Sequence, residues 1–129
     1  MLDTNVISEV FKRKGNAGAL DWLAATPTPE VCLSDLTIAE IESGIEYLSA
    51  RGQQGDQERA QKLRTWVRDD VTSNFSGRIL PITRRTLEIW SQLMGMQKVK
   101  GGGEFPIDFL YAAQARGCQE PYAKSGLRL

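Results

Sequence analysis

The sequence predicts an α/β fold in which short buried strands alternate with amphipathic helices. Two apolar segments, residues 31–34 and 78–82, have the length and composition of short parallel strands. Elsewhere, apolar residues recur at helical intervals, as they do through residues 38–48. Because the two kinds of segment alternate along the chain, we expect a three-layer α/β/α sandwich with a short central parallel sheet and many helices.

Local signals place the individual elements. A first strand is expected to end at Leu2, followed by a helix that starts near Thr4. Asn16 is a candidate N-cap for a second short helix, which the two prolines within residues 26–29 should end. Further helices are predicted over residues 37–48, 56–75 and 87–94, and from residue 106 onward. We expect the tryptophans and methionines of these helices to be core residues.

Bulk composition is that of one ordinary globular domain. The chain has 129 residues, of which 41% are hydrophobic and 25% are charged. No run approaches the roughly 20 apolar residues of a membrane-spanning helix, and no signal peptide is recognisable. Cys32 and Cys118 lie far apart and match no metal-binding spacing. We therefore expect a cytoplasmic protein with reduced thiols and no membrane association.

Charge and histidine content narrow the possible chemistry. Sixteen Lys and Arg residues balance sixteen Asp and Glu residues, so nucleic-acid binding would need a local patch of charge. The chain contains no histidine, which excludes Ser-His-Asp triads and histidine-based zinc sites. Clusters of acids and the metals that they bind remain as candidates.

Three acids, Asp3, Glu40 and Asp108, each stand where a helix begins. In a doubly wound sheet such positions can gather at the carboxyl ends of the strands, where ligands bind. Each acid also has a purely structural explanation: Asp3 as an N-cap, Glu40 in a capping box with Thr37, and Asp108 at the positive end of a helix dipole. The matched placement of all three favours a shared site.

Carboxylates brought this close together need a cation, and oxygen-only ligands suit Mg²⁺ or Mn²⁺. A metal of this kind can activate water and stabilise phosphate oxygens, which indicates phosphodiester hydrolysis. Thr4 and Asn5 are candidates to support the water shell of the metal. Lys12, Arg13 and Lys14 are either solvated charges at a helix end or contacts to RNA phosphates.

Several motifs together resemble the PIN domain of VapC-type toxins. They are Leu-Asp-Thr-Asn-Val-Ile-Ser-Glu at residues 2–9, Ser-x-x-Thr-x-Ala-Glu-Ile-x-x-Gly-Ile at 34–45, Arg-Ile-Leu-Pro at 78–81, and Asp108 with its following Ala-Ala pair. The resemblance implies a Mg²⁺-dependent endoribonuclease toxin, usually a homodimer, held inactive by a VapB-like antitoxin. It also implies that Asp3, Glu40 and Asp108 are the catalytic and metal-binding acids.

The resemblance covers residues 1–115, a PIN-like domain, and ends in a divergent tail over residues 116–129. Here the family continues with a strand and a Thr-Arg-Asn-x-x-Asp motif, whereas residues 117–126 contain no Asp. Residues 120–125 can be encoded by codons that read Ser-Leu-Thr-Arg-Asn in a shifted frame. We therefore predict that a frameshift produced this tail, which would account for the missing last strand and fourth acid.

Two rival functions remain. One is a catalytically impaired PIN-fold protein that binds antitoxin or RNA without cleaving it. The other is a small-molecule phosphatase, which would need a strand-end Asp-x-Asp pair where this chain has Asp3-Thr4-Asn5. For the antitoxin we expect an apolar groove near the helices that hold Trp22, Ile41 and Ile45.

Overall fold

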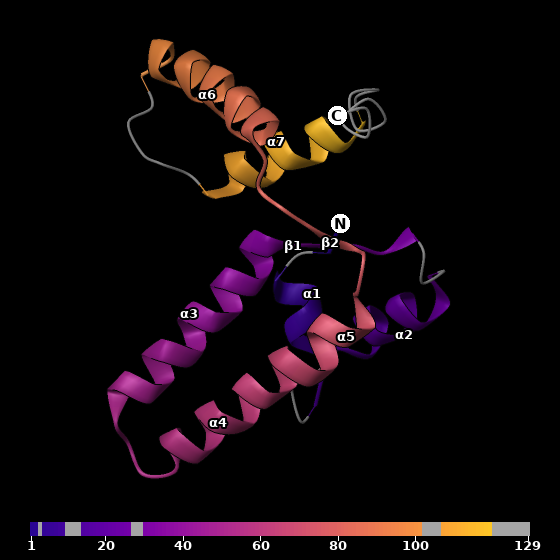
Figure 1. Cartoon of the computed structure of the whole chain (residues 1–129), viewed down its shortest axis with the longest axis vertical. Coiled ribbons are helices and arrows are strands. Elements are labelled where there is room, and N and C mark those ends of the chain that lie inside the picture. The colour runs from indigo at the N-terminus through magenta and orange to yellow at the C-terminus, as the bar shows by residue number, and fades with distance from the viewer. Residues whose placement is uncertain (3, 10–13, 27–29, 102–106, 120–129) are drawn as a thin grey trace. The chain divides into compact units, whose positions relative to one another are not determined.

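The computed structural model describes residues 1–2, 4–9, 14–26, 30–101 and 107–119 (Figure 1). The chain divides into two compact units, Met1–Pro81 and Ile82–Leu129, and each is described by itself. No helix within the described ranges is both long enough and apolar enough to cross a bilayer.

The first unit begins with helices α1 (Thr4–Glu9) and α2 (Ala17–Ala25). Asn16 caps α2 as predicted, because its side chain accepts a hydrogen bond of 3.0 Å from the backbone N–H of Ala19. Gly15 allows the chain to turn closely between the two helices. A Cβ atom at this position would lie only 2.4 Å from the Glu9 carbonyl oxygen.

Two short parallel strands form the sheet of this unit. They are β1 (Leu33–Ser34) and β2 (Ile79–Leu80), with Leu33 opposite Ile79. Both fall inside the predicted segments but are shorter. The predicted first strand is not formed at Leu2, although the Leu2 N–H donates a 2.8 Å hydrogen bond to the Cys32 carbonyl.

A helical hairpin projects from β1 (Figure 1). It consists of α3 (Asp35–Arg51) and α4 (Asp56–Trp66). Gly52 ends α3 with a φ of 68°, a left-handed conformation that glycine adopts without strain. The side chain of Arg51 then donates hydrogen bonds of 2.9 and 2.8 Å to Asp56, which ties the two ends of the turn together.

The helix predicted over residues 56–75 is confirmed, with an irregular middle. After α4 the backbone continues as a π-helical segment, η2 (Val67–Val71), and then as α5 (Thr72–Asn74). The Thr72 hydroxyl donates a 2.8 Å hydrogen bond to the Val67 carbonyl. The Thr72 backbone N–H bonds the same carbonyl, so the hydroxyl adds a second donor to it within the widened turn.

Apolar side chains of the first unit form two core clusters. One joins Leu2 to β1, α1 and η2, and the other packs α3 against α4. The buried members of the first are Leu2, Ile7, Val31, Leu33 and Val71, and those of the second are Ile45, Ala60 and Val67. The core therefore fixes α1 and α3 on a common framework.

The second unit is an α-helical pair, α6 (Arg84–Val99) and α7 (Ile107–Gln119). Thr83 caps α6 through a capping box with Thr86. The expectation that every tryptophan and methionine is a core residue is wrong. In the chain as described, Met94 is buried, but Trp22 is 54% exposed and Met96 is 59% exposed.

Candidate functional site

Glu40 lies in the second turn of α3, close to the end of β1. Ser34 starts this helix, because its side chain accepts a 3.0 Å hydrogen bond from the N–H of Leu36. The purely structural explanation of Glu40, a capping box with Thr37, therefore does not apply: α3 begins earlier, at Asp35, and Thr37 is completely buried. This leaves the Glu40 carboxylate on a half-exposed face of the helix.

A hydroxyl from a distant part of the sequence meets that carboxylate. The Thr4 Oγ1 atom donates a hydrogen bond to Glu40 Oε2, across 36 residues of sequence. Thr4 is the first residue of α1, and its own carbonyl accepts a 2.6 Å hydrogen bond from the Ser8 hydroxyl. The bond therefore joins the N-terminus of α1 to α3 and restricts the orientation of the Glu40 side chain.

These groups open onto a pocket of about 700 Å³. Its chemistry varies along the lining: hydroxyls and a carboxylate come from α1 and α3, apolar side chains come from α3 and α4, and cations come from α4. The full lining comprises Thr4, Ser8, Glu40, Ile41, Gly44, Ile45, Arg59, Lys62, Leu63 and Trp66. An amphipathic ligand with an anionic group matches this combination of a cationic wall and apolar side chains.

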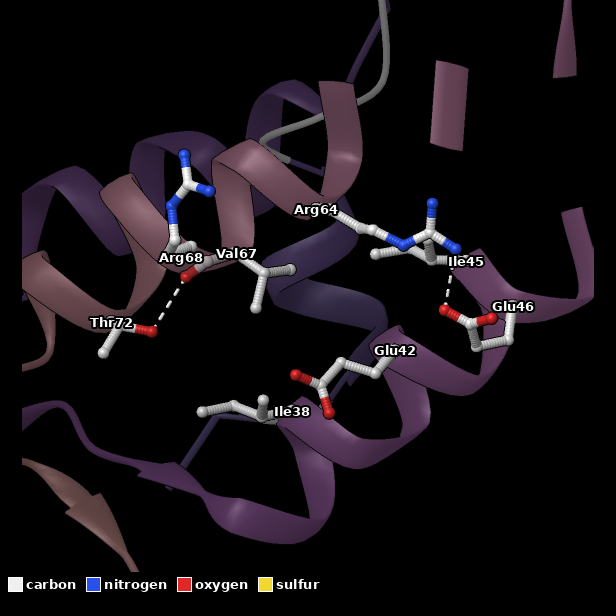
Figure 2. Close-up of a pocket in the computed structure, with 8 residues that line it drawn as sticks. All are labelled: Ile38, Glu42, Ile45, Glu46, Arg64, Val67, Arg68 and Thr72. Carbon is white, nitrogen blue, oxygen red and sulfur yellow. Dashed lines mark hydrogen bonds and ion pairs between the residues drawn. The ribbon is translucent and has the colours of Figure 1, made fainter. Parts of the chain in front are cut away.

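A second pocket, of about 480 Å³, is shown in Figure 2, and Ile45 lines both pockets. Its cations are already neutralised by neighbouring acids. Arg64 bonds Glu46 at 2.8 Å, the pair joined by a dashed line in Figure 2, and Arg68 bonds the adjacent Asp69 at 2.6 Å. The nearby Asp69 carboxylate, mainly through its hydrogen bond, raises the pKa of Arg68. The Arg64 and Arg68 cations at this pocket are therefore paired within the protein.

The three predicted metal-site acids fall in different parts of the description. Asp3 lies outside the described residues. Glu40 lines the first pocket, and Asp108 stands exposed in the first turn of α7, in the second unit. Among the described residues no three acidic or cysteine side chains gather into a metal site, and the predicted trio includes Asp3, which is not one of them. The trio remains a prediction.

The supporting residues separate in the same way. Thr4 contacts Glu40 directly, whereas Asn5 is exposed and does not line either pocket. Lys12 and Arg13, predicted to contact RNA, lie outside the described residues. Lys14 is exposed and lines neither pocket.

The donor set that is described suits a hard divalent cation. A carboxylate and a hydroxyl, Glu40 and Thr4, offer only oxygen atoms, and they border a pocket. Mg²⁺ and Mn²⁺ favour oxygen ligands and commonly keep several waters, for which a pocket leaves space. The other acids of the predicted set are Asp3, which precedes Thr4 in the chain, and Asp108.

Sequence reasoning missed the cations of this pocket. Apolar spacing predicts the helix over residues 56–75 and says nothing of Arg59 and Lys62, although their spacing of three residues puts them on one face of α4. Two of the residues named for the expected antitoxin groove, Ile41 and Ile45, line this pocket. Trp22 does not line it, whereas Trp66 does. The helical spacing of residues 59, 62, 63 and 66 is the signal that could have found this face.

Comparison with known proteins gives a consistent result. Residues 1–121 match the family model described as the PIN domain. Plasmid stability protein StbB of Pseudomonas syringae pv. tomato is 30% identical over 115 residues, which cover 89% of this chain and 78% of StbB. Toxin FitB of Neisseria gonorrhoeae is 29% identical over 116 residues, which cover 90% of this chain and 79% of FitB. VapC ribonuclease Y4jK of Sinorhizobium fredii is 29% identical over 101 residues, covering 78% and 68%.

Solved structures agree with the sequence relatives. The crystal structure of FitAcB from Neisseria gonorrhoeae has a TM-score of 0.72 and 29% identity, with 88% of this chain and 78% of that chain covered. The structure of FitAB bound to an IR36 DNA fragment has a TM-score of 0.71 and 30% identity, with 89% and 76% covered.

Proposed function

The chain belongs to the PIN domain family, and on that basis we propose that it is a Mg²⁺-dependent endoribonuclease toxin of a bacterial toxin–antitoxin pair. The family and the α/β PIN-like fold predicted from the sequence are both confirmed. One relative is named a VapC ribonuclease and another a toxin. These names support RNA as the substrate and intoxication as the biological role.

The observation that carries the proposal is the hydrogen bond from Thr4 to Glu40 at the edge of a pocket. A carboxylate that only caps its own helix has no need of a hydroxyl from another helix. Held in this way, Glu40 directs an oxygen to a fixed position, as a metal ligand must. We propose that Glu40 binds the ion together with Asp3 and Asp108, with Mn²⁺ able to replace Mg²⁺.

An ion held by these residues would supply Lewis-acid chemistry: activation of water and stabilisation of phosphate oxygens. The chain itself contributes the orientation of the ligands. Thr4 fixes Glu40, and the core residues around Ile7 and Leu33 hold α1 and β1 in place. Since the chain has no histidine, proton transfer at this site would fall to other side chains, of which the Glu40 carboxylate is one.

A VapB-like antitoxin is the proposed partner, and a homodimer is the proposed assembly. Two structural neighbours are titled FitAcB and FitAB, the second bound to a DNA fragment. An antitoxin segment that occupies the pocket beside Glu40 would exclude RNA and inhibit cleavage. We propose that the protein acts in the cytoplasm, where its RNA substrates are.

The test is cleavage of a total RNA pool by protein freed of any antitoxin, with Mg²⁺ or with EDTA. Cleavage with Mg²⁺ that EDTA abolishes, and that Glu40→Gln lowers by at least about 100-fold, supports the nuclease. RNA binding without cleavage in either condition supports the second candidate, a catalytically impaired binding protein. The observation that favours this second candidate is the lack of an Asp in residues 117–126, where the resembling family has its fourth acid.

A further inference from the structure

Binding of RNA by this chain requires a local concentration of positive charge. The net charge is zero, with sixteen basic and sixteen acidic residues, so the molecule as a whole does not attract a polyanion. Most of the affinity of single-stranded nucleic acid for proteins comes from contacts between cations and phosphates. The place of those cations on the surface therefore decides where the strand runs.

Helix α4 presents two cations to the same pocket as Glu40. Arg59 and Lys62 are three residues apart, which puts them on one face of the helix, and both line the pocket of about 700 Å³. On the facing helix, α3, the pocket is lined by Glu40. A strand whose scissile phosphate lies at Glu40 would thus have a neighbouring part of its backbone beside α4.

Arg59 is available for a ligand. Among the residues that the structure describes, no hydrogen bond or ion pair within 4 Å engages its guanidinium, which contributes only a Coulombic effect on Asp56. Lys62 bonds Glu58 at 2.6 Å, but both side chains are about three-quarters exposed (73% and 74%). Exposed pairs of this kind contribute little to stability and exchange readily for a phosphate.

The remaining lining suits the rest of a nucleotide. Leu63 and Trp66, which also pack against the core of this unit, give the pocket apolar surface. Gly44 has no side chain to fill the pocket on the α3 side. The space beside it is open, since a Cβ atom there would have no neighbour within 4 Å. Sites for single-stranded nucleic acid combine aromatic or apolar surface for bases with cations for the backbone.

We infer that Arg59, with Lys62 beside it, forms a phosphate-binding subsite on α4 that positions the RNA strand next to the bond cleaved at Glu40. The inference rests on the proposed nuclease function and assigns Arg59 a positioning role, without a part in the chemical step. A guanidinium binds a phosphate by two parallel hydrogen bonds, so Arg59 provides geometry as well as charge.

The test compares Arg59→Gln with Arg59→Lys and with the matched control Arg64→Gln. Arg64 belongs to the same helix but lines the other pocket, where Glu46 already neutralises it (Figure 2). Binding of a fluorescein-labelled single-stranded RNA is measured by anisotropy in EDTA over a series of salt concentrations, and kcat and KM are measured with Mg²⁺. Circular dichroism verifies that each variant is folded.

For Arg59→Gln we expect the Kd for RNA to rise roughly tenfold. The slope of the logarithm of the association constant against the logarithm of salt concentration should become shallower by about 0.7, the value for one lost phosphate contact on a single strand. KM should rise with little change in kcat. Arg59→Lys should recover the slope, since it keeps the charge, and Arg64→Gln should match the wild type.

Three results would overturn the subsite: an unchanged slope and KM in Arg59→Gln, an equal loss in Arg64→Gln, or no binding of RNA by the wild-type chain. Weakened antitoxin binding by Arg59→Gln with unaltered RNA binding would also overturn it and assign the face to a protein partner. The wild-type chain could bind RNA without cleaving it while Arg59→Gln still makes the salt dependence of RNA binding shallower. That result would contradict the proposed nuclease function and support the phosphate-binding subsite.

Discussion

The Thr4 hydroxyl donates a hydrogen bond to the Glu40 carboxylate, and so links the first residue of α1 to the second turn of α3. If Glu40 binds the metal, this bond sets the orientation of its carboxylate. Thr4→Val should then lower metal affinity and RNA cleavage by roughly 10–100-fold, the usual effect of losing a partner that orients a ligand. Metal titration and single-turnover cleavage measure the two effects.

The conservative change Thr4→Ser is the control for that experiment. It keeps the hydroxyl and should stay within a few-fold of the wild type, with an unchanged circular dichroism spectrum. Cleavage by Thr4→Val at the wild-type rate would show that the hydroxyl does not position Glu40.

Acid should weaken the α3–α4 hairpin through Asp56. Hydrogen bonds from the Arg51 guanidinium hold the pKa of this carboxyl below its usual value of 3.8, and the N–H of Gln53 adds a further bond at 3.1 Å. A lowered pKa in the folded state stabilises the protein above the usual pKa, and this contribution is lost as pH falls through the lowered one. Asp56→Asn should therefore lower the free energy of unfolding at pH 7, with the difference from the wild type shrinking below pH 3.8.

Urea unfolding at a series of pH values measures this effect. Glu58→Gln is the matched control, because Glu58 is on the same helix and also has a lowered pKa, caused chiefly by its hydrogen bond from Lys62. Its side chain is 74% exposed, so its loss should change stability much less. Equal losses in the two variants at pH 7 would contradict a special role for the Arg51–Asp56 pair.

Leu33 should be a sensitive core position. Its side chain is completely buried in β1, within the cluster that also holds Leu2 and Ile7. Leu33→Ala should lower the free energy of unfolding by about 2–5 kcal/mol, because it removes buried methyl groups and leaves a cavity. Tyr47→Ala is the control, because Tyr47 is 70% exposed. This substitution should change the free energy of unfolding by no more than about 0.5 kcal/mol. A loss at Leu33 as small as that at Tyr47 would contradict the described core.

The prediction that residues 116–129 form a divergent tail can be tested on the gene. If a frameshift produced it, the alternative reading frame after codon 116 encodes Thr-Arg-Asn. The nucleotide sequence is the measurement. An alternative frame that encodes any other sequence at that point would show that the tail is native and that the fourth acid was never part of this chain.

Local rules predicted much of the fold. Asn16 was identified as a helix cap because its short side chain reaches a free N–H of the first turn, and the structure confirms the bond. A second local rule, the helical spacing of apolar residues, predicted the helices observed as α3, α4 and α6. The strand expected at Leu2 failed because one backbone bond to Cys32 does not make a ladder.

The candidate site was harder to predict, since it depends on contacts between distant segments. The capping-box rule linked Glu40 with Thr37, three residues away, whereas Glu40 accepts a bond from Thr4, 36 residues away. Likewise, no sequence rule says that the face of α4 with Arg59 and Trp66 lines the same pocket as Glu40. The packing of α3 against α4 determines which residues share the pocket. The residue spacing of either helix alone does not predict this packing.

The central claim is that Asp3, Glu40 and Asp108 bind one metal ion, and the most direct test is Mn²⁺ binding followed by electron paramagnetic resonance. Asp3→Asn, Glu40→Gln and Asp108→Asn should each weaken binding by at least about tenfold, because each removes a charged oxygen ligand. Asp35→Asn, an exposed acid in the first turn of α3, is the control and should bind Mn²⁺ like the wild type. If Asp108→Asn also binds Mn²⁺ like the wild type, the three acids do not share an ion and the account is wrong.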